Sequence, residues 1–312
     1  MTAPRVSVVV PTHNRGPVLS RAIESVLAQS EQRFEILVVD DGSPNNEQLD
    51  IVTMYRDSRL HYSRLPTRRG PAAARNLGVR NAHAPYVAFL DDDDEWLPEK
   101  LAWQLAILDR AESHIGAVCT ARYTVNQRTG TIEETRCSVA DFDRPLFRNI
   151  ITTSSMVVRR ECFDKIGFFD EALEASSDYD MWLRLSRAYR IYYLDEALVR
   201  YFLHGGQISA DFAKKARSTT RLLEKHAEVL SQDRKAFSRK HVALGISRGR
   251  SGDIRGAQRA FLKSIRLDPL GRSGYVCLAL SFFGAKRFRE VLEGRARYAE
   301  PDTSRTSARD AL

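Results

Sequence analysis

Cysteine is scarce in this 312-residue sequence, and so are the long apolar runs that mark membrane segments. The four cysteines lie far apart and form no CxxC pair, which argues against a disulfide framework or a zinc site. The longest apolar candidate, Gly274–Ala285, is only about half as long as a bilayer-spanning helix. The first ten residues hold only the short, mostly apolar run Val6–Val10, too short for a signal-peptide core. These absences predict a cytoplasmic protein in a reducing compartment.

Two common nucleotide-binding motifs are also missing. No GxGxxG follows the first predicted strand, and no GxxxxGK[ST] occurs anywhere in the sequence. Both motifs use glycines to bring backbone N–H groups close to phosphates. Their absence argues against a dinucleotide-dependent dehydrogenase and against a P-loop enzyme.

Positive charge is concentrated in the C-terminal third of the chain. Residues 205–312 hold 23 Lys/Arg and 11 Asp/Glu, whereas residues 1–204 hold 25 and 29. Such a basic block suits either an anionic partner or well-solvated helix faces. No aromatic-rich basic strand or helix-turn-helix pattern is present, so we expect no nucleic-acid partner. We expect peripheral contact with an anionic membrane at its inner face, because the basic region surrounds the short apolar segment Tyr275–Phe288.

Apolar β-branched runs alternate with helical patterns over the first hundred residues. Three of the four strand runs are continuous rather than alternating, which is typical of strands buried on both faces, and the run Leu60–Arg64 predicts a short strand. Their spacing predicts right-handed βαβ units in a mostly parallel α/β sheet flanked by helices. The predicted strands are Val6–Val10, Glu35–Val39, Leu60–Arg64 and Tyr86–Leu90, and the predicted helices are Pro17–Gln29, Asn45–Tyr55, Pro71–Asn81 and Pro98–Ala111.

The pattern changes after Ala111. Further strands are predicted at Gly116–Val125, Thr131–Val139, Ser154–Arg159 and Arg190–His204, with one helix at Asp178–Tyr189. We place a domain boundary near Gly205–Gly206. It separates a catalytic domain (1–205) from a basic, all-helical C-terminal region (206–300) and a polar, disordered tail (301–312). The helices predicted in that region are Lys240–Arg250, Ile254–Leu267 and Tyr275–Phe283, and Gly252–Pro269 resembles one helix of a tetratricopeptide-type repeat.

Polar segments follow three of the predicted strands, at Pro11–Gly16, Asp40–Ser43 and Asp91–Asp94. Ligands of open α/β sheets bind at the carboxyl ends of the strands, so we expect these segments to meet at one edge. Four adjacent carboxylates at Asp91–Asp94 repel one another, and a Mg²⁺ or Mn²⁺ ion among them would relieve that repulsion. Helix capping by Asp94 or Glu95 would explain one of the acids but not four.

The segments SVVVPTHNR, ILVVDDGS, GPAAARNLG and YVAFLDDDDEWLP, in this order and spacing, resemble the family-two glycosyltransferases. The later segments SSDYDMWLRL and YFLHGGQIS are similar to that family's acceptor-side motifs, so the resemblance covers about residues 5–210. It implies a GT-A fold. It also implies inverting transfer of a sugar from a nucleoside diphosphate sugar, UDP-linked, to a hydroxyl of a glycan or lipid-linked saccharide, in cell-surface glycan or polysaccharide synthesis.

The resemblance further implies which residues act on the donor. The residues that it places on the donor nucleotide are Pro11, Thr12, Asn14, Arg15, Asp41, Gly70, Arg75, Asn76, Asp91 and Asp92. The Asp91–Asp93 segment fits the family's DxD motif, in which Asp93 would hold Mg²⁺ or Mn²⁺. His204 matches a histidine that contacts the metal or the diphosphate. The extra acid at Asp92 leaves the register of the motif open by one residue.

Asp178 matches the family's catalytic base. An inverting transferase needs a carboxylate that takes the proton from the acceptor hydroxyl as its oxygen attacks the sugar. Many relatives have Glu before this Asp, whereas this chain has Ser177. A plain helix N-cap role for Asp178 stays open, and Asp180 is the alternate base. A carboxylate at a helix N-terminus is expected to have a lowered pKa.

Simpler roles stay open for four other residues. Asp41 could form a turn before Gly42, Arg75 could be a surface helix residue, and His204 could be a loop histidine. Trp182 is either core packing or the floor of the acceptor site.

Two other functions compete with glycosyl transfer. Nucleotidyltransferases also combine strand-end acids with a metal, but they need a Gly-rich basic loop after the first strand, which PTHNRG does not supply. The main alternative is a catalytically inactive GT-A-like module that acts through its basic tail as a binding protein. The preserved acid cluster counts against that alternative.

Overall fold

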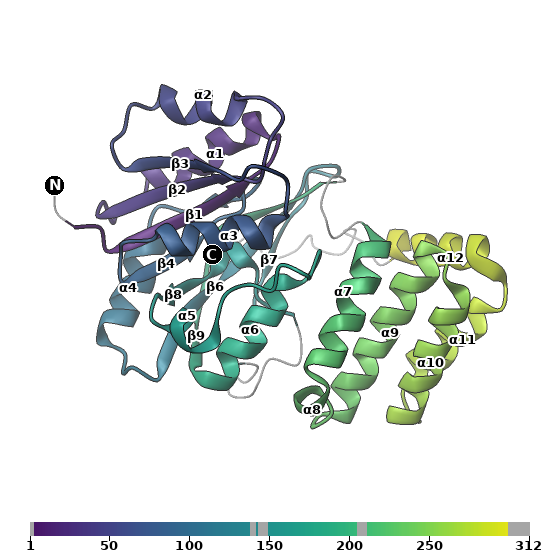
Figure 1. The fold of residues 1–312 in the computed structure, drawn as a ribbon. Coiled ribbons are helices and arrows are strands. Elements are labelled where there is room, and N and C mark those ends of the chain that lie inside the picture. The colour runs from purple at the N-terminus through teal and green to yellow at the C-terminus, as the bar shows by residue number, and fades with distance from the viewer. Residues whose placement is uncertain (1–2, 138–141, 143–148, 205–210, 299–312) are drawn as a thin grey trace, which may run out of the picture. The chain divides into compact units, whose positions relative to one another are not determined.

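The computed structural model describes residues 3–137, 142, 149–204 and 211–298, with side chains as far as residue 292. The chain divides into two compact units, Met1–Ala210 and Asp211–Leu312 (Figure 1). The boundary predicted at Gly205–Gly206, the end of the strand predicted at Thr131–Val139, and the tail 301–312 lie outside the described residues.

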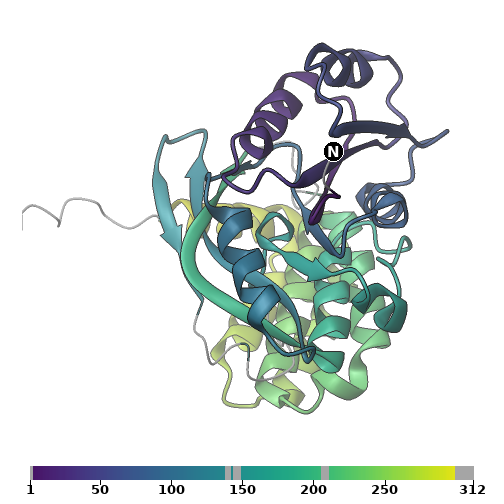
Figure 2. The same ribbon diagram turned by 90° about the vertical axis from the view of Figure 1, so that its left-hand side faces the viewer.

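A single curled sheet forms the middle of the first unit (Figure 2). Its strand order is β3-β2-β1-β4-β8-β6-β9-β5, and β7 pairs with β6 beside this path. Strands β1 to β4 are parallel, as predicted, whereas β8 runs antiparallel to both β4 and β6, and β5 runs antiparallel to β9. The strands are β1 (Val6–Thr12), β2 (Phe34–Asp40), β3 (Leu60–Arg64), β4 (Tyr86–Phe89), β5 (Glu95–Trp96), β6 (Ile115–Asn126), β7 (Ile132–Thr135), β8 (Val157–Arg159) and β9 (Arg190–Leu203).

The helices of this unit cover the faces of the sheet. Strands β1 and β2 are buried along their whole length, which explains their continuous apolar sequences. The apolar face of the first helix, with Leu19, Ile23 and Val26, packs into the same core. The elements are α1 (Gly16–Leu27), α2 (Glu47–Met54), α3 (Pro71–Asn81), α4 (Lys100–Arg110), the 3₁₀ turn η2 (Thr153–Ser155), α5 (Cys162–Ile166) and α6 (Ser177–Ala188).

The register of the parallel strands places the polar segments at one edge. Thr12 at the end of β1 pairs with Asp40 at the end of β2. Leu90, directly after β4, donates its backbone N–H to the carbonyl of Val9 in β1, so the acids that follow begin beside the end of β1. The predicted gathering of these segments at the carboxyl edge is therefore present in the structure.

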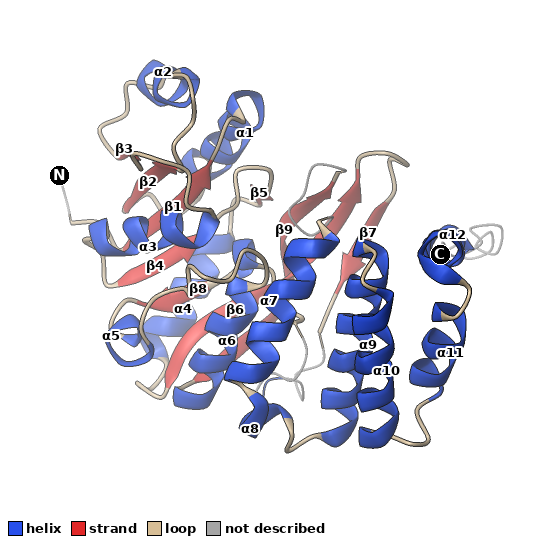
Figure 3. Cartoon of the chain, turned by 45° about the vertical axis from the view of Figure 1, so that its right-hand side comes forward, coloured by secondary structure: helices blue, strands red, loops and turns tan. Residues whose placement is uncertain are grey.

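Every regular element in the described part of the second unit is a helix, as predicted (Figure 3). Asp211, Asp233 and Asp253 are the N-cap residues of α7, α9 and α10, and each accepts a backbone N–H of the first helical turn. Glycines of α9 allow close packing, because a Cβ on Gly245 would lie 2.3 Å from the ring of Phe261. In the described part of the chain, no helix combines the length and apolarity that a membrane crossing requires. The helices are α7 (Phe212–Lys225), α8 (Ala227–Leu230), α9 (Arg234–Ser251), α10 (Ile254–Leu267), α11 (Arg272–Ser281) and α12 (Gly284–Tyr298).

Candidate active site

The loop after β1 contacts both neighbouring polar segments. Thr12 donates its hydroxyl hydrogen to the Asp92 carboxylate at 2.8 Å, and its carbonyl accepts the backbone N–H of Asp41 at 2.8 Å. Asn14 adopts a left-handed backbone with φ of 52° and donates its N–H to Ser43 Oγ at 2.9 Å. Pro11 is buried within β1. The structure thus brings the residues predicted after β1, β2 and β4 into one cluster.

Arginines surround the four acids Asp91–Asp94, which form the acid loop. Arg15 lies 2.6 Å from the Asp93 carboxylate and 3.2 Å from that of Asp92. Arg75 lies 2.5 Å from the Asp91 carboxylate, and Arg21 donates to the backbone carbonyl of Asp93 at 2.6 Å. Repulsion among the four acids therefore does not by itself require a metal, because side chains of the protein already offset it.

Asp94 is the most deeply buried acid of the loop. It has no exposed surface and accepts hydrogen bonds from Ser154 Oγ and from the backbone N–H of Phe202. Burial, with the nearby charges of Asp91 and Asp93, raises its pKa well above the usual range. The N-cap of α4 is Glu99, so the capping role considered for Asp94 or Glu95 is wrong.

Burial also raises the pKa of Asp92, to about 7. The neighbouring Asp93 adds to this rise, whereas the charge of Arg15 and the hydroxyl of Thr12 oppose it. Asp92 therefore points into the protein and toward the β1 loop. Asp91 and Asp93 keep more exposed carboxylates at the surface of the loop.

Asp93 and His204 converge on one point. His204 follows β9 directly, and its Nε2 lies 2.8 Å from Asp93 Oδ2, so it is more than a plain loop histidine. Among the described residues, no group of three or more His, Cys, Asp or Glu forms a ready-made metal cluster. The Asp93 carboxylate fits Mg²⁺ or Mn²⁺, because such ions often take only one or two protein carboxylates and complete their shell with phosphates and water. The His204 nitrogen beside it is a weaker ligand for these ions.

Asp41 holds the loop that leads into α3. Its two carboxylate oxygens accept the backbone N–H groups of Arg69 at 2.7 Å and Gly70 at 2.8 Å. Gly70 has a φ of 94°, which favours glycine, and a Cβ placed there would meet no described atom within 4 Å. Asp41 therefore binds backbone that lies 28 residues further along the chain and is not a local turn former. The backbone at Gly70 faces open space. Contact of either residue with a nucleotide stays a prediction.

The adjacent residues Arg75 and Asn76 of α3 have different surroundings. Arg75 is 6% exposed and lies among Asp91, Asp93 and Asp178, so a surface role for it is wrong. Asn76 is buried, donates to the carbonyl of Phe169 at 3.0 Å, and accepts the N–H of Phe169 at 2.8 Å. Its amide thus holds the segment before α6, and its predicted contact with the donor is untested.

Asp178 lies in the first turn of α6. The N-cap of this helix is Ser176, so Asp178 is not a plain N-cap. Burial raises the pKa of its carboxyl group, and Asp91 adds to the rise, whereas Arg75, the N–H of Tyr179 and the Asn149 side chain oppose it. The expectation of a lowered pKa is therefore wrong, because loss of hydration outweighs the helix terminus.

The alternate base, Asp180, is held elsewhere. It has no exposed surface and accepts hydrogen bonds from Nε and Nη2 of Arg184 at 3.0 and 2.8 Å. Trp182, two residues further along α6, is also buried and packs against the rings of Phe89 and Phe169, which assigns it to the core. Asp178 is thus the carboxylate of α6 that faces Arg75 and the acid loop.

Sequence reasoning missed three residues that contact this site. Arg21 on α1 binds the Asp93 carbonyl, Ser154 in η2 binds the acid loop, and the Asn149 side chain hydrogen-bonds to Asp178. Arg21 also lies over the ring of Phe202, 3.8 Å from its centroid. None of these residues belongs to a motif, so no local sequence signal could have identified them.

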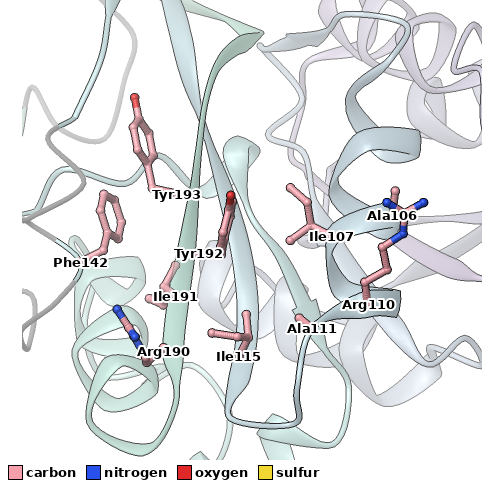
Figure 4. A pocket seen from close by; sticks show the side chains of 10 residues that line it. All are labelled: Ala106, Ile107, Arg110, Ala111, Ile115, Phe142, Arg190, Ile191, Tyr192 and Tyr193. Carbon is pink, nitrogen blue, oxygen red and sulfur yellow. The ribbon is translucent and has the colours of Figure 1, made fainter.

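A pocket of about 650 Å³ lies at the edge of the sheet opposite to the acid loop (Figure 4). The end of α4, the first residues of β6 and β9, and Phe142 line it. Strand β6 begins there and runs in the same direction as β4, so this pocket is far from the carboxyl edge that carries the acid loop. The predicted site residues therefore do not depend on this pocket.

Comparison with known proteins adds to this geometry. The family described as Glycosyl transferase family 2 matches residues 7–173, which is more than half of the chain. The putative colanic acid biosynthesis glycosyl transferase WcaA of Escherichia coli K12 is 31% identical over 75% of this chain and 85% of its own length. Five uncharacterized glycosyltransferases of Rickettsia species are 27–29% identical. The chain spans 82% of one of them and less than two thirds of the other four.

Solved structures show the same fold. Residues 1–349 of Staphylococcus aureus TarS, in complex with UDP-GlcNAc, match 94% of this chain and 92% of that one, with a TM-score of 0.67 and 21% identity. The mannosyltransferase PcManGT of Pyrobaculum calidifontis, in complex with GDP-Man and Mn²⁺, matches 95% and 85%, with a TM-score of 0.60 and 18% identity. Because the family match covers more than half of the sequence, the chain belongs to glycosyltransferase family 2 and is a glycosyltransferase with the GT-A fold.

Proposed function

We propose that the protein transfers one sugar from a UDP-linked donor to an acceptor hydroxyl, with inversion at the sugar and with help from Mg²⁺ or Mn²⁺. The observation that carries this proposal is the convergence of Arg15, Arg75 and Asp178 on the acid loop at the carboxyl edge of the sheet. Anion-binding cations, a pair of candidate metal ligands and one carboxylate on the acceptor-side helix are the groups that such a transfer needs. A glycan or lipid-linked saccharide is the proposed acceptor, in polysaccharide synthesis, as the name of WcaA supports.

Asp93 and His204 are the residues that would hold the cation. When bound, a divalent ion supplies positive charge that stabilises the departing diphosphate. Arg15 and Arg75 add fixed positive charge at the same edge, and each already binds a carboxylate of the acid loop. We therefore place the diphosphate of the donor beside these two arginines. The complexes of TarS with UDP-GlcNAc and of PcManGT with GDP-Man and Mn²⁺ support a nucleotide-sugar donor.

Asp178 is the proposed general base. The acceptor hydroxyl oxygen forms a bond to C1 of the sugar while the bond from C1 to the diphosphate oxygen breaks, and Asp178 takes the hydroxyl proton. Burial raises its pKa, which makes it a stronger base than an exposed aspartate. Arg75 opposes that rise and keeps the carboxylate available in its charged form.

Calorimetric titration tests the donor half of this proposal. We expect UDP to bind the purified protein in the presence of Mn²⁺ and to bind at least about tenfold more weakly without it. GDP and dTDP are titrated in parallel, because the solved relatives carry different bases. Tighter Mn²⁺-dependent binding of GDP would move the donor to the GDP-linked class. Failure of all three nucleotides to bind folded protein would contradict the proposal and favour an inactive module.

We also propose that the second unit contacts an anionic membrane surface. Residues 253–290 hold eight Lys/Arg, all exposed, against three acidic residues, Asp253, Asp268 and Glu290. Large apolar side chains are exposed in the same region, among them Phe282 at 73% and Phe283 at 62%. A predominantly basic surface with exposed aromatic residues suits an anionic bilayer, because lysine and arginine attract the lipid head groups and the aromatic rings enter the interface.

Flotation with vesicles that contain phosphatidylglycerol tests this contact. We expect the wild-type protein to float with the vesicles at low salt and to be released at high salt, because lipid charge is screened. Replacement of Phe282 and Phe283 by Ser should weaken binding by roughly tenfold. Ile132→Ser, at a similarly exposed position of the first unit, is the matched control and should float normally. Wild-type protein that does not float, or that floats regardless of salt and of both phenylalanines, would contradict this contact.

A further inference from the structure

The turn η2 reaches the acid loop through the side chain of Ser154. This side chain has no exposed surface. Its hydroxyl donates a hydrogen bond to the Asp94 carboxylate and accepts the backbone N–H of Asp91 at 3.1 Å. A hydroxyl group offers one donor and two acceptor positions, so both bonds can form at the same time. Ser154 therefore connects the first acid of the loop to the last, and the candidate metal ligand Asp93 lies between them.

The backbone of the turn is itself held by buried side chains. Trp96 Nε1 donates to the carbonyl of Ser154 at 2.7 Å, and Gln104 Nε2 donates to the carbonyl of Ser155 at 2.9 Å. Trp96 and Gln104 are both buried. Because both carbonyls are fixed from β5 and α4, the position of the Ser154 hydroxyl is set by rigid elements and not by the acid loop. A rigid hydroxyl can then determine the shape of the loop.

The same segment also reaches the other side of the site. Asn149, four residues before η2, hydrogen-bonds through its side chain to Asp178. The stretch from Asn149 to Ser155 therefore contacts both the acid loop and the candidate base. Within this stretch, Ser154 is the residue that hydrogen-bonds to the acid loop, which holds the candidate metal ligand Asp93.

We propose that Ser154 is a positioning residue, which holds the acid loop in the shape in which Asp93 and His204 receive a divalent cation together with the donor diphosphate. This inference rests on the proposed function, because it assigns a role at the same site. Without the hydroxyl, the Asp91 amide and the Asp94 carboxyl each lose a buried partner, and the loop gains freedom to shift Asp93. Groups that hydrogen-bond directly to metal ligands typically change metal affinity by about 10–100-fold when they are removed. Ser154 acts on Asp93 through the neighbouring acids of the loop, so we expect the lower end of this range, about tenfold.

The test compares Ser154→Ala with Ser155→Ala. Ser155 is the matched control because it lies in the same turn, is equally buried, and donates its hydroxyl to the local carbonyl of Thr152 at 2.8 Å. The first measurement is the hydrogen exchange rate of the Asp91 amide, which does not depend on activity. The second is the affinity for UDP in the presence of Mn²⁺, measured by calorimetry with the full chain.

Ser154→Ala should speed exchange of the Asp91 amide and weaken Mn²⁺-dependent UDP binding by about tenfold. Ser155→Ala should change both by less than about threefold. If Ser154→Ala does not fold, Ser154→Cys has nearly the same size with a much weaker donor, and it should show the same two changes to a smaller degree.

Three results would overturn the inference, and each points to a different error. Unchanged exchange at Asp91 would mean that the hydroxyl does not hold the loop. Faster exchange with unchanged UDP affinity would reduce Ser154 to a structural role. Wild-type protein that binds none of UDP, GDP and dTDP with Mn²⁺ would overturn the proposed function, and this role with it, whatever the exchange rates are.

Discussion

The Asp178→Asn variant is expected to lose about 10²–10⁴-fold in transfer rate while it still binds the donor nucleotide. The amide keeps the size and one acceptor of the carboxylate but cannot take a proton at neutral pH. Loss of fold is not expected, because burial already disfavours the charge on Asp178, as its raised pKa indicates. Steady-state transfer rates, together with calorimetric titration of UDP and Mn²⁺, measure the two quantities separately. A variant with full turnover would show that another group takes the proton.

Asp164→Asn is the matched control for this variant. Asp164 also lies in the first turn of a helix, α5, but its side chain is exposed. Its replacement should leave the transfer rate within about twofold of wild type, so a general effect of removing a helix-terminal charge can be excluded. A comparable rate loss in this control would mean that the Asp178 result does not report on the base.

The pH dependence of the wild-type rate provides a second signature of Asp178. A base works only when it is deprotonated, so the rate falls as the pH drops through the pKa of that base. Because the pKa of Asp178 is raised, the rate should fall at a pH above the pKa of an ordinary aspartate, which is about 3.9. Transfer rates measured with the acceptor saturating would show this acidic limb. A rate that stays constant below that range would contradict the assignment.

Arg75 links the two halves of the proposed chemistry. It binds the Asp91 carboxylate at 2.5 Å, and its charge opposes the raised pKa of Asp178. A diphosphate near Arg75 would compete for the same guanidinium, so donor binding and the basicity of Asp178 are expected to be coupled. The sequence pattern GPAAARNLG marks this arginine but gives no sign that its partners lie 16 and 103 residues away.

The elements with local signals were predictable from the sequence. Strand β3 and helix α3 have the predicted bounds, Leu60–Arg64 and Pro71–Asn81. The start of α3 was predictable because Pro71 favours the first helical position and the glycine before it allows the positive φ. The segment Ser154–Arg159 was only partly right. Its first residues form the turn η2, because the carbonyls of Ser154 and Ser155 bind side chains of Trp96 and Gln104 that are more than 50 residues away.

The site was predictable as a set of motifs but not as a geometry. Strand ends showed that the acids, the β1 loop and Asp41 share one edge, since parallel strands align their carboxyl ends. The compensation of the acids by Arg15, Arg75 and Arg21 could not be predicted, because it depends on how α1 and α3 pack against the sheet. The direction of the pKa shift of Asp178 was predicted wrongly for the same reason, because the burial of a side chain depends on the tertiary fold.

The Asp93→Asn variant is expected to weaken Mn²⁺-dependent UDP binding by roughly 100-fold or more, because even outer-shell changes at metal sites cost about 10–100-fold. Its effect without metal should have the opposite sign. Removal of one negative charge beside Arg15 reduces repulsion of the diphosphate, so metal-free UDP should bind at least as well as it does to wild type. A variant that is merely misfolded would lose both kinds of binding. Calorimetry with and without Mn²⁺ therefore separates loss of the metal ligand from loss of the fold.

The neighbouring acid Glu95 provides the control. It follows the acid loop directly and pairs with Arg200 at 2.7 Å, outside the cluster around Arg15. Glu95→Gln should keep Mn²⁺-dependent UDP binding within about threefold of wild type, since its carboxylate does not face the proposed cation. If Asp93→Asn binds UDP with Mn²⁺ as wild type does, the cation lies on another acid of the loop. Asp91→Asn would then be the variant that loses metal dependence, which would move the cation to the other exposed carboxylate of the loop and leave the transferase assignment intact.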